Sequence, residues 1–131
     1  MPVSSEFQDG IFVVTAAGEY ALDDLVAVVT NGYSHPNFAQ TTPLLFDTRR
    51  STANPTSDDV QQMCRRILGL RPPGHIGKWA LVTGKDPLRF GIGRMGSLTM
   101  QSLGVPVEVF TEMDPALAYI RRDRMAGPPT P

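Results

Sequence analysis

Apolar and polar positions along the chain form blocks that predict a regular succession of strands and helices. Short runs rich in β-branched residues predict strands over residues 3–8, 11–17, 43–47, 78–83 and 105–110. Apolar residues at helical spacing predict helices over residues 21–33, 58–68, 87–102 and 114–124, the first ending at Gly32. This alternation favours one small α/β domain with a mixed, mostly parallel five-stranded sheet and about four helices.

Local signals sharpen the boundaries of these elements. Asp9 and Gly10 form a strong turn signal, so the first two strands are expected to pair as an antiparallel hairpin at the edge of the sheet. Asp86 followed by Pro87 places a carboxylate at a helix N-cap and a proline at the first helical position. The same two residue types recur at residues 114–115 and predict the start of the last helix.

Length and charge limit the classes of function. The chain has 131 residues, and its 12 basic and 13 acidic residues give a formal net charge of −1. This balance argues against nucleic-acid binding and against a polybasic membrane patch. The N-terminus lacks a secretory signal, and no apolar run approaches the ~20 residues that span a bilayer, so we expect a cytoplasmic protein without stable membrane insertion. A folded domain is expected over residues 1–124 and a disordered Pro-rich tail over residues 125–131.

The residue types that bind metals and cofactors are sparse. Cys64 is the sole cysteine, and its position on an apolar helix face predicts a buried thiol rather than a nucleophile. His35 and His75 lie in proline-containing loops without further ligands at metal-binding spacing. The glycines of residues 91–96 fall inside a helix rather than in a strand-to-helix turn, so they are not a dinucleotide fingerprint. We therefore expect neither a metal nor a cofactor.

Three segments of the chain resemble a known family. The strings LLFDTR, WALVTGKDPLRFGIGRM and VEVFTEMDPALAYI are similar, in order and spacing, to the SpoIIAA-like family, and the resemblance extends over roughly residues 7–122. It implies a STAS or CRAL-TRIO style fold with a mixed five-stranded sheet and four helices. It also implies a binding or regulatory role rather than an enzymatic one.

The chain departs from the family's phosphorylated members at one motif. Relatives that antagonise anti-sigma factors carry Asp-Ser, a small residue and Gly at a helix start, and this serine is phosphorylated. Here Asp47-Thr48 occurs at a strand end, and no Asp-Ser-x-Gly is present. The candidate phosphorylation sites are Thr48, Ser51, Thr52, Thr56 and Ser57. Their alternative role is ordinary turn formation and helix capping.

A polar segment after the third strand is the first candidate site. Ligands of open α/β sheets bind beyond the carboxyl ends of the strands, and Arg49, Lys85 and Arg89 are expected to converge there on the helix that begins at Pro87. The candidate anion or ligand site comprises Asp47, Thr48, Arg49, Ser51, Thr52, Lys85 and Arg89. The alternative is a solvated loop, spanning residues 47–52, whose charges pair with one another.

A second candidate is an apolar groove along the glycine-bearing helix. Its side chains would be Phe90, Ile92, Met95 and Met100. The glycines of residues 91–96 suggest close packing against another element or a bend in this helix. The alternative is ordinary core packing with methionine as a filler.

Three functions remain open. The first is a non-catalytic regulatory module that binds a protein partner or a second copy of itself. The second is a carrier or sensor of a small apolar or amphipathic, lipid-like ligand. The third, an enzyme that uses Asp47 with a nearby Arg or Lys, is disfavoured because no nucleophile–base pair can be inferred from spacing.

Overall fold

The computed structural model describes residues 2–126, with the side chains of residues 123–126 left out. The expected tail begins inside the last helix, and its remaining residues, 127–131, lie outside the described residues. The elements, in chain order, are β1 (Val3–Gln8), β2 (Ile11–Gly18), α1 (Leu22–Tyr33), β3 (Leu44–Ser51), α2 (Ser57–Gly69), β4 (Trp79–Val82), α3 (Pro87–Ser102), β5 (Val107–Phe110) and α4 (Met113–Ala126).

The strands form one mixed sheet in the order β1-β2-β3-β4-β5. β1 pairs antiparallel with β2, and the other neighbours pair in parallel. The predicted α/β class, the five strands and the four helices are confirmed. The hairpin turn is confirmed as well, because Asp9 and Gly10 have φ angles of 53° and 78°. These positive values are those of the two central residues of a type I′ turn.

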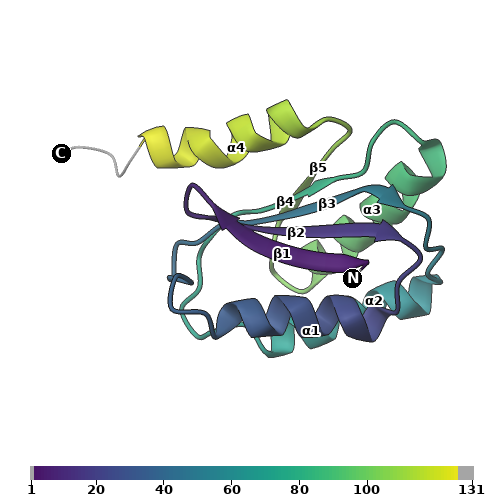
Figure 1. Ribbon diagram of the computed structural model, residues 1–131, viewed down its shortest axis with the longest axis horizontal. Coiled ribbons are helices and arrows are strands. Elements are labelled where there is room, and N and C mark those ends of the chain that lie inside the picture. The colour runs from purple at the N-terminus through teal and green to yellow at the C-terminus, as the bar shows by residue number, and fades with distance from the viewer. Residues whose placement is uncertain (1, 127–131) are drawn as a thin grey trace.

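The sheet separates two cores of unequal size. Figure 1 shows α4 on one side of the sheet and α1 and α2 on the other. Phe12 and Val14 of β2 pack in the larger core, which α1, α2 and α3 cover, whereas Val13 packs with Ala116 and Ile120 of α4 in the smaller core. Successive residues of β2 therefore pack in opposite layers, because side chains alternate across a pleated strand.

Two helices begin with well-formed caps. Thr56 caps α2 in a capping box, in which its hydroxyl accepts from the backbone N–H of Asp59 while the Asp59 carboxylate accepts from the backbone N–H of Thr56. Asp86 caps α3 by accepting from the backbone N–H of Leu88, at 2.9 Å, and Pro87 occupies the first turn as predicted.

The structure corrects three predictions about the ends of elements. The first helix ends at Tyr33, as predicted, but Gly32 does not form its stop: it lies in the last turn of α1, where an added Cβ would stand 2.1 Å from the Phe12 ring. The last helix begins at Met113, so Asp114 lies in its first turn rather than at its N-cap. The third correction is the largest. The strand expected over residues 43–47 continues to Ser51, because its polar half stays paired with β2.

Candidate functional site

The polar segment of residues 47–52 is mostly strand, and it contains a bulge. Between the pairs Thr15↔Asp47 and Ala17↔Arg50, β3 uses three residues where β2 uses two. Residues three apart in a regular strand face opposite sides, yet Thr48 and Ser51 both line the cavity described below. The bulge thus turns Ser51 toward the layer of α1–α3, as bulges near sites commonly re-aim a side chain.

Asp47 is held by its neighbour two residues along the strand. Arg49 donates from Nε and Nη2 to the two Asp47 carboxylate oxygens, both at 2.9 Å, and its backbone N–H donates at 3.1 Å. Burial would raise the pKa of Asp47, but these hydrogen bonds and the charges of Arg49 and Arg50 outweigh it, so the pKa is lowered. Asp47 is therefore an ion-pair partner and a poor general base.

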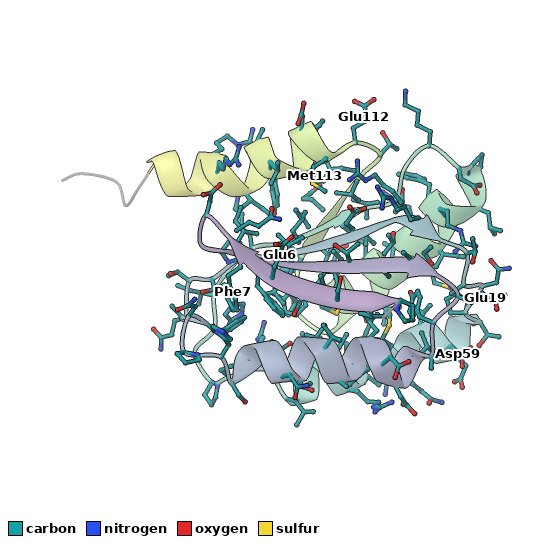
Figure 2. All side chains as sticks on the ribbon, in the orientation of Figure 1. Glu6, Phe7, Glu19, Asp59, Glu112 and Met113 are labelled. Atoms are coloured by element: carbon teal, nitrogen blue, oxygen red, sulfur yellow. The ribbon has the colours of Figure 1, made fainter. Side chains whose placement is uncertain are left out.

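The structure does not bring the three predicted cations together. Arg49 is paired with Asp47, and the Lys85 Nζ lies 3.4 Å from the Glu112 carboxylate. Figure 2 shows Glu112 beside the start of α4, on the opposite side of the sheet from Asp59 of α2. Arg89 points into the other layer, where it is only 9% exposed. The predicted anion site between these three side chains and the start of α3 is therefore not formed.

Arg89 instead binds the segment that joins β3 to α2. Its Nη1 donates to the carbonyl of Ala53, and its Nη2 donates to the side-chain oxygen of Asn54. Both acceptors are neutral, and Arg89 has no carboxylate partner among the described residues. Its position was indicated by helical spacing, because Arg89 stands on the same face of α3 as Gly93, Gly96 and Met100.

A cavity of about 110 Å³ lies between the sheet and helices α2 and α3. Its walls are largely apolar, and Ile92 and Met100 of the predicted groove line it, whereas Phe90 and Met95 do not. The side chains that give the cavity its apolar character come from β2 to β5, α1, α2 and α3: Val14, Ala16, Leu25, Phe46, Val60, Met63, Ile67, Trp79, Leu81, Ile92, Met100 and Val107.

Polar groups line the same cavity near the carboxyl ends of the strands. Tyr20, which follows β2, hydrogen-bonds with Ser51 at the end of β3, and both line the cavity with Arg89. Burial raises the pKa of Tyr20, while Ser51 and the charge of Arg89 act in the opposite direction. The phenol is thus neutral at physiological pH. Thr48 donates to the carbonyl of Val82 at 3.0 Å.

The residue types suited to nucleophilic or metal chemistry are held in structural roles. Burial raises the pKa of the Cys64 thiol to about 11, which makes it inert as a nucleophile. His75 is buried, and its Nε2 lies 2.7 Å from the carbonyl oxygen of Thr42. Within the described residues, no group of three or more His, Cys, Asp or Glu side chains is placed to hold a metal ion. No helix in residues 2–126 is long and apolar enough to cross a membrane.

The candidate phosphorylation sites divide by exposure. Ser51 is 7% exposed, and Thr48 is half-buried and hydrogen-bonded. Thr52 and Thr56 are exposed in the segment between β3 and α2, and Ser57 is exposed at the first position of α2. The Thr56 hydroxyl already serves as the cap of α2. Any modification of the folded chain in this segment is therefore expected at Thr52, Thr56 or Ser57.

The solvent face of α3 carries two exposed leucines, which the sequence pattern did not reveal, beside the exposed Arg94. Leu88 is 56% exposed and Leu98 is 55% exposed. Gly91 lies between them on the same helical face, where an added Cβ would meet nothing within 4 Å. This surface, composed of Leu88, Gly91 and Leu98, is called the α3 face below.

Comparisons with known proteins support the fold. No protein-family model matches the chain, and no curated protein does. A solved structure of an anti-sigma factor antagonist from Mycobacterium paratuberculosis is similar, with a TM-score of 0.60 and 17% sequence identity. The match covers 91% of this chain and 92% of that chain. The chain therefore has the α/β fold of an anti-sigma factor antagonist, the SpoIIAA-like architecture that the sequence resemblance implied.

Proposed function

We propose that the chain is a non-catalytic regulatory module that binds a partner protein through the α3 face. The observation that supports this most directly is the pair of exposed leucines, Leu88 and Leu98, on a face of α3 that carries Gly91 between them. Burial of apolar surface is the main favourable term in most protein association. The open position at Gly91, between the two leucines, allows the backbone of a partner to approach closely.

The chemistry of the polar residues agrees with a binding role. Asp47 is neutralised by Arg49, and Cys64 is a buried thiol with a raised pKa. Neither residue has the arrangement of an activated nucleophile or of a poised base. We also propose a cytoplasmic location, in keeping with the free thiol of Cys64.

The fold suggests the class of partner. The solved structure that resembles this chain is described as an anti-sigma factor antagonist, a protein that acts on another protein. We propose an anti-sigma factor as the partner here. Unlike the family's phosphorylated members, this chain lacks Asp-Ser-x-Gly. Regulation of binding by phosphorylation would therefore have to use another hydroxyl, such as that of Thr52 or Ser57.

Binding to purified anti-sigma factors from the same genome tests this proposal. Each is titrated with the full chain by calorimetry, and then with the variants Leu88→Asp and Leu98→Asp. Either variant is expected to weaken binding at least about tenfold, because it places a charge in an apolar contact. The matched control is Ile76→Asp, because Ile76 is 75% exposed but lies in the segment before β4, outside α3.

Two results would contradict the proposal. One is equal loss of affinity in Ile76→Asp and in the two α3-face variants, which would indicate a non-specific effect of charge. The other is a dimer in sedimentation that Leu98→Asp dissociates, with no anti-sigma factor bound by either form. In that case the α3 face would be an interface between copies of this chain.

A further inference from the structure

The cavity between the sheet and helices α2 and α3 has no part in the protein-docking proposal. Its volume is about 110 Å³, which compares with the ~150 Å³ of an engineered apolar cavity that accepts benzene. By proportion, it would accommodate about four or five carbon atoms. Its walls are contributed by both helices and by β2 to β5. A small apolar group would therefore be enclosed on several sides.

One wall of this cavity carries a buried positive charge. Arg89 is 9% exposed and lines the cavity, and its bonds to Ala53 and Asn54 go to neutral oxygens. A guanidinium has five N–H donors, so further donors remain available. Burial of a charge without an ion-pair partner is unfavourable. An anion in the cavity would relieve this cost and would bind through charge-assisted hydrogen bonds.

Two further polar groups favour a ligand with acceptor atoms. Tyr20 and Ser51, each of which carries a hydroxyl, line the cavity together with Arg89. Trp79 also lines it, is 2% exposed, and has an indole N–H without a hydrogen-bond acceptor among the described residues. Buried donors in folded proteins are nearly always paired. The cavity thus combines apolar walls with a buried cation, and one of its lining residues, Trp79, has a buried donor without a partner among the described residues.

We propose that this cavity binds a small amphipathic carboxylic acid. Its carboxylate lies against the Arg89 guanidinium near the hydroxyls of Tyr20 and Ser51, and its hydrocarbon body of about four or five carbons fills the apolar part. Arg89 selects for the acid, and the cavity volume limits the chain length. This inference goes beyond the proposed docking role and does not depend on it, because no residue of the α3 face lines the cavity.

The test uses the full chain and a series of sodium carboxylates: acetate, butyrate, pentanoate and octanoate. Trp79 is the sole tryptophan, so its fluorescence reports events at the cavity directly, and calorimetry gives the affinity. Pentanoate is expected to bind with a Kd of about 1 mM, because a ligand with so few non-hydrogen atoms can gain only a small binding free energy. Acetate lacks the apolar body and octanoate exceeds the cavity, so each is expected to bind at least about tenfold more weakly.

Two variants separate the charge from the cavity. Arg89→Met is expected to weaken pentanoate binding about ten- to hundredfold, because the charged donor is lost, while binding of the uncharged 1-pentanol is expected to weaken much less. Gly96→Met keeps Arg89 but extends a side chain from a cavity-lining position. An added Cβ there would lie 3.7 Å from Val60, an ordinary contact, so the first carbon of the new side chain fits without a clash. Gly96→Met is expected to abolish binding of both ligands.

Several results would overturn the inference. Absence of a saturable signal with pentanoate at about 50 times the expected Kd would do so, as would equal affinity for acetate, pentanoate and octanoate. Unchanged pentanoate binding in Gly96→Met would place the ligand outside the cavity. If Arg89→Met does not fold, as judged by circular dichroism, Gly96→Met and the comparison of pentanoate with 1-pentanol on the wild type decide the matter.

Discussion

Helices α2 and α3 lie side by side on the same face of the sheet, yet the surfaces that they present to solvent differ in polarity. The exposed residues in the middle of α2 are polar or charged: Asp58, Gln61, Gln62, Arg65 and Arg66. Those of α3 include Leu88, Gly91 and Leu98, and only Arg94 among them carries a charge. α2 is an ordinary amphipathic helix whose apolar residues are buried in the core.

The inner faces of the two helices differ as well. α2 buries Val60, Cys64 and Ile67 in the larger core. α3 approaches the sheet through Gly93, where an added Cβ would stand 2.5 Å from the Thr83 side chain. α3 therefore packs by backbone proximity and leaves leucines outside. Both helices contribute to the cavity wall. The difference indicates that the outer face of α2 mainly keeps the fold in contact with water, whereas α3 also provides the exposed surface on which protein binding is proposed.

The largest expected effect tests the division between inner and outer apolar residues. Ile67→Ala is expected to lower the free energy of unfolding by about 2–5 kcal/mol, because it leaves a cavity beneath α2. Leu98→Ala is expected to change it by no more than about 0.5 kcal/mol, because Leu98 is 55% exposed. Urea denaturation of both variants measures the contrast. Similar losses of unfolding free energy in the two variants would show that Leu98 is packed rather than exposed. The proposed difference between the outer faces of α2 and α3 would then be wrong.

Two glycines of α3 sharpen the comparison within one helix. Gly93→Ala is expected to destabilise the protein by about 1–3 kcal/mol, because its methyl group would overlap the Thr83 side chain. Gly91→Ala is expected to stabilise it by about 0.5–1 kcal/mol, because the position is open and alanine favours the helix. Opposite signs in thermal denaturation are the expected result. A stabilising Gly93→Ala would mean that α3 does not depend on this close approach.

The contact between the two helices is expected to weaken in alkali. The Cys64 Sγ lies 3.8 Å from the Gly96 carbonyl, and burial raises the pKa of this thiol from 9.0 to about 11. The unfolded chain therefore releases this proton first, and stability falls as the pH rises from about 9 to about 11, by up to about 2 kcal/mol. Urea titrations across this range measure it. Cys64→Ala is the control, and a decline of the same steepness in this variant would assign the effect to other groups, such as Tyr20 and Tyr33.

The smallest effect concerns the helix starts. Thr56→Ala removes one bond of the capping box of α2 and is expected to lower the free energy of unfolding by about 1 kcal/mol. Asp86→Ala removes the single side-chain cap of α3, where Pro87 still favours the first turn, so a smaller loss is expected. Chemical denaturation of both variants compares them. A larger loss in Asp86→Ala would indicate that the start of α3 depends on its cap more than that of α2 does.

Local signals in the sequence predict much of the fold. The turn at Asp9 and Gly10, the start of α3 at Asp86 and the order of the elements all follow from short-range chemistry, and the structure confirms each. The misplaced end of β3 has a different origin. Arg49 and Arg50 are typical of a loop by polarity, yet their backbone stays in the sheet because β2 continues beside them. Tertiary pairing overrides local preference there.

The candidate site was less accessible to sequence reasoning. Ile92 and Met100 were predicted as groove residues and line the cavity, but the cavity itself arises from how α2 and α3 meet the sheet. Arg89 was placed with Arg49 and Lys85 because all three follow strand ends. Its helical position opposite Leu98 indicates an inward direction instead. Spacing along the helix was thus a better guide to Arg89 than proximity to the strand end.

The bulge in β3 decides which layer receives the Ser51 hydroxyl. If β3 paired with β2 over the same residues without the bulge, Ser51 would turn away from Tyr20, toward α4. The cavity would then lose one polar group without any substitution in its walls. Deleting one residue between Asp47 and Arg50 would instead remove the extra residue and leave Ser51 opposite Gly18, on the cavity side. A variant that lacks one residue there is therefore expected to keep the contact between Ser51 and Tyr20 while its core stays intact.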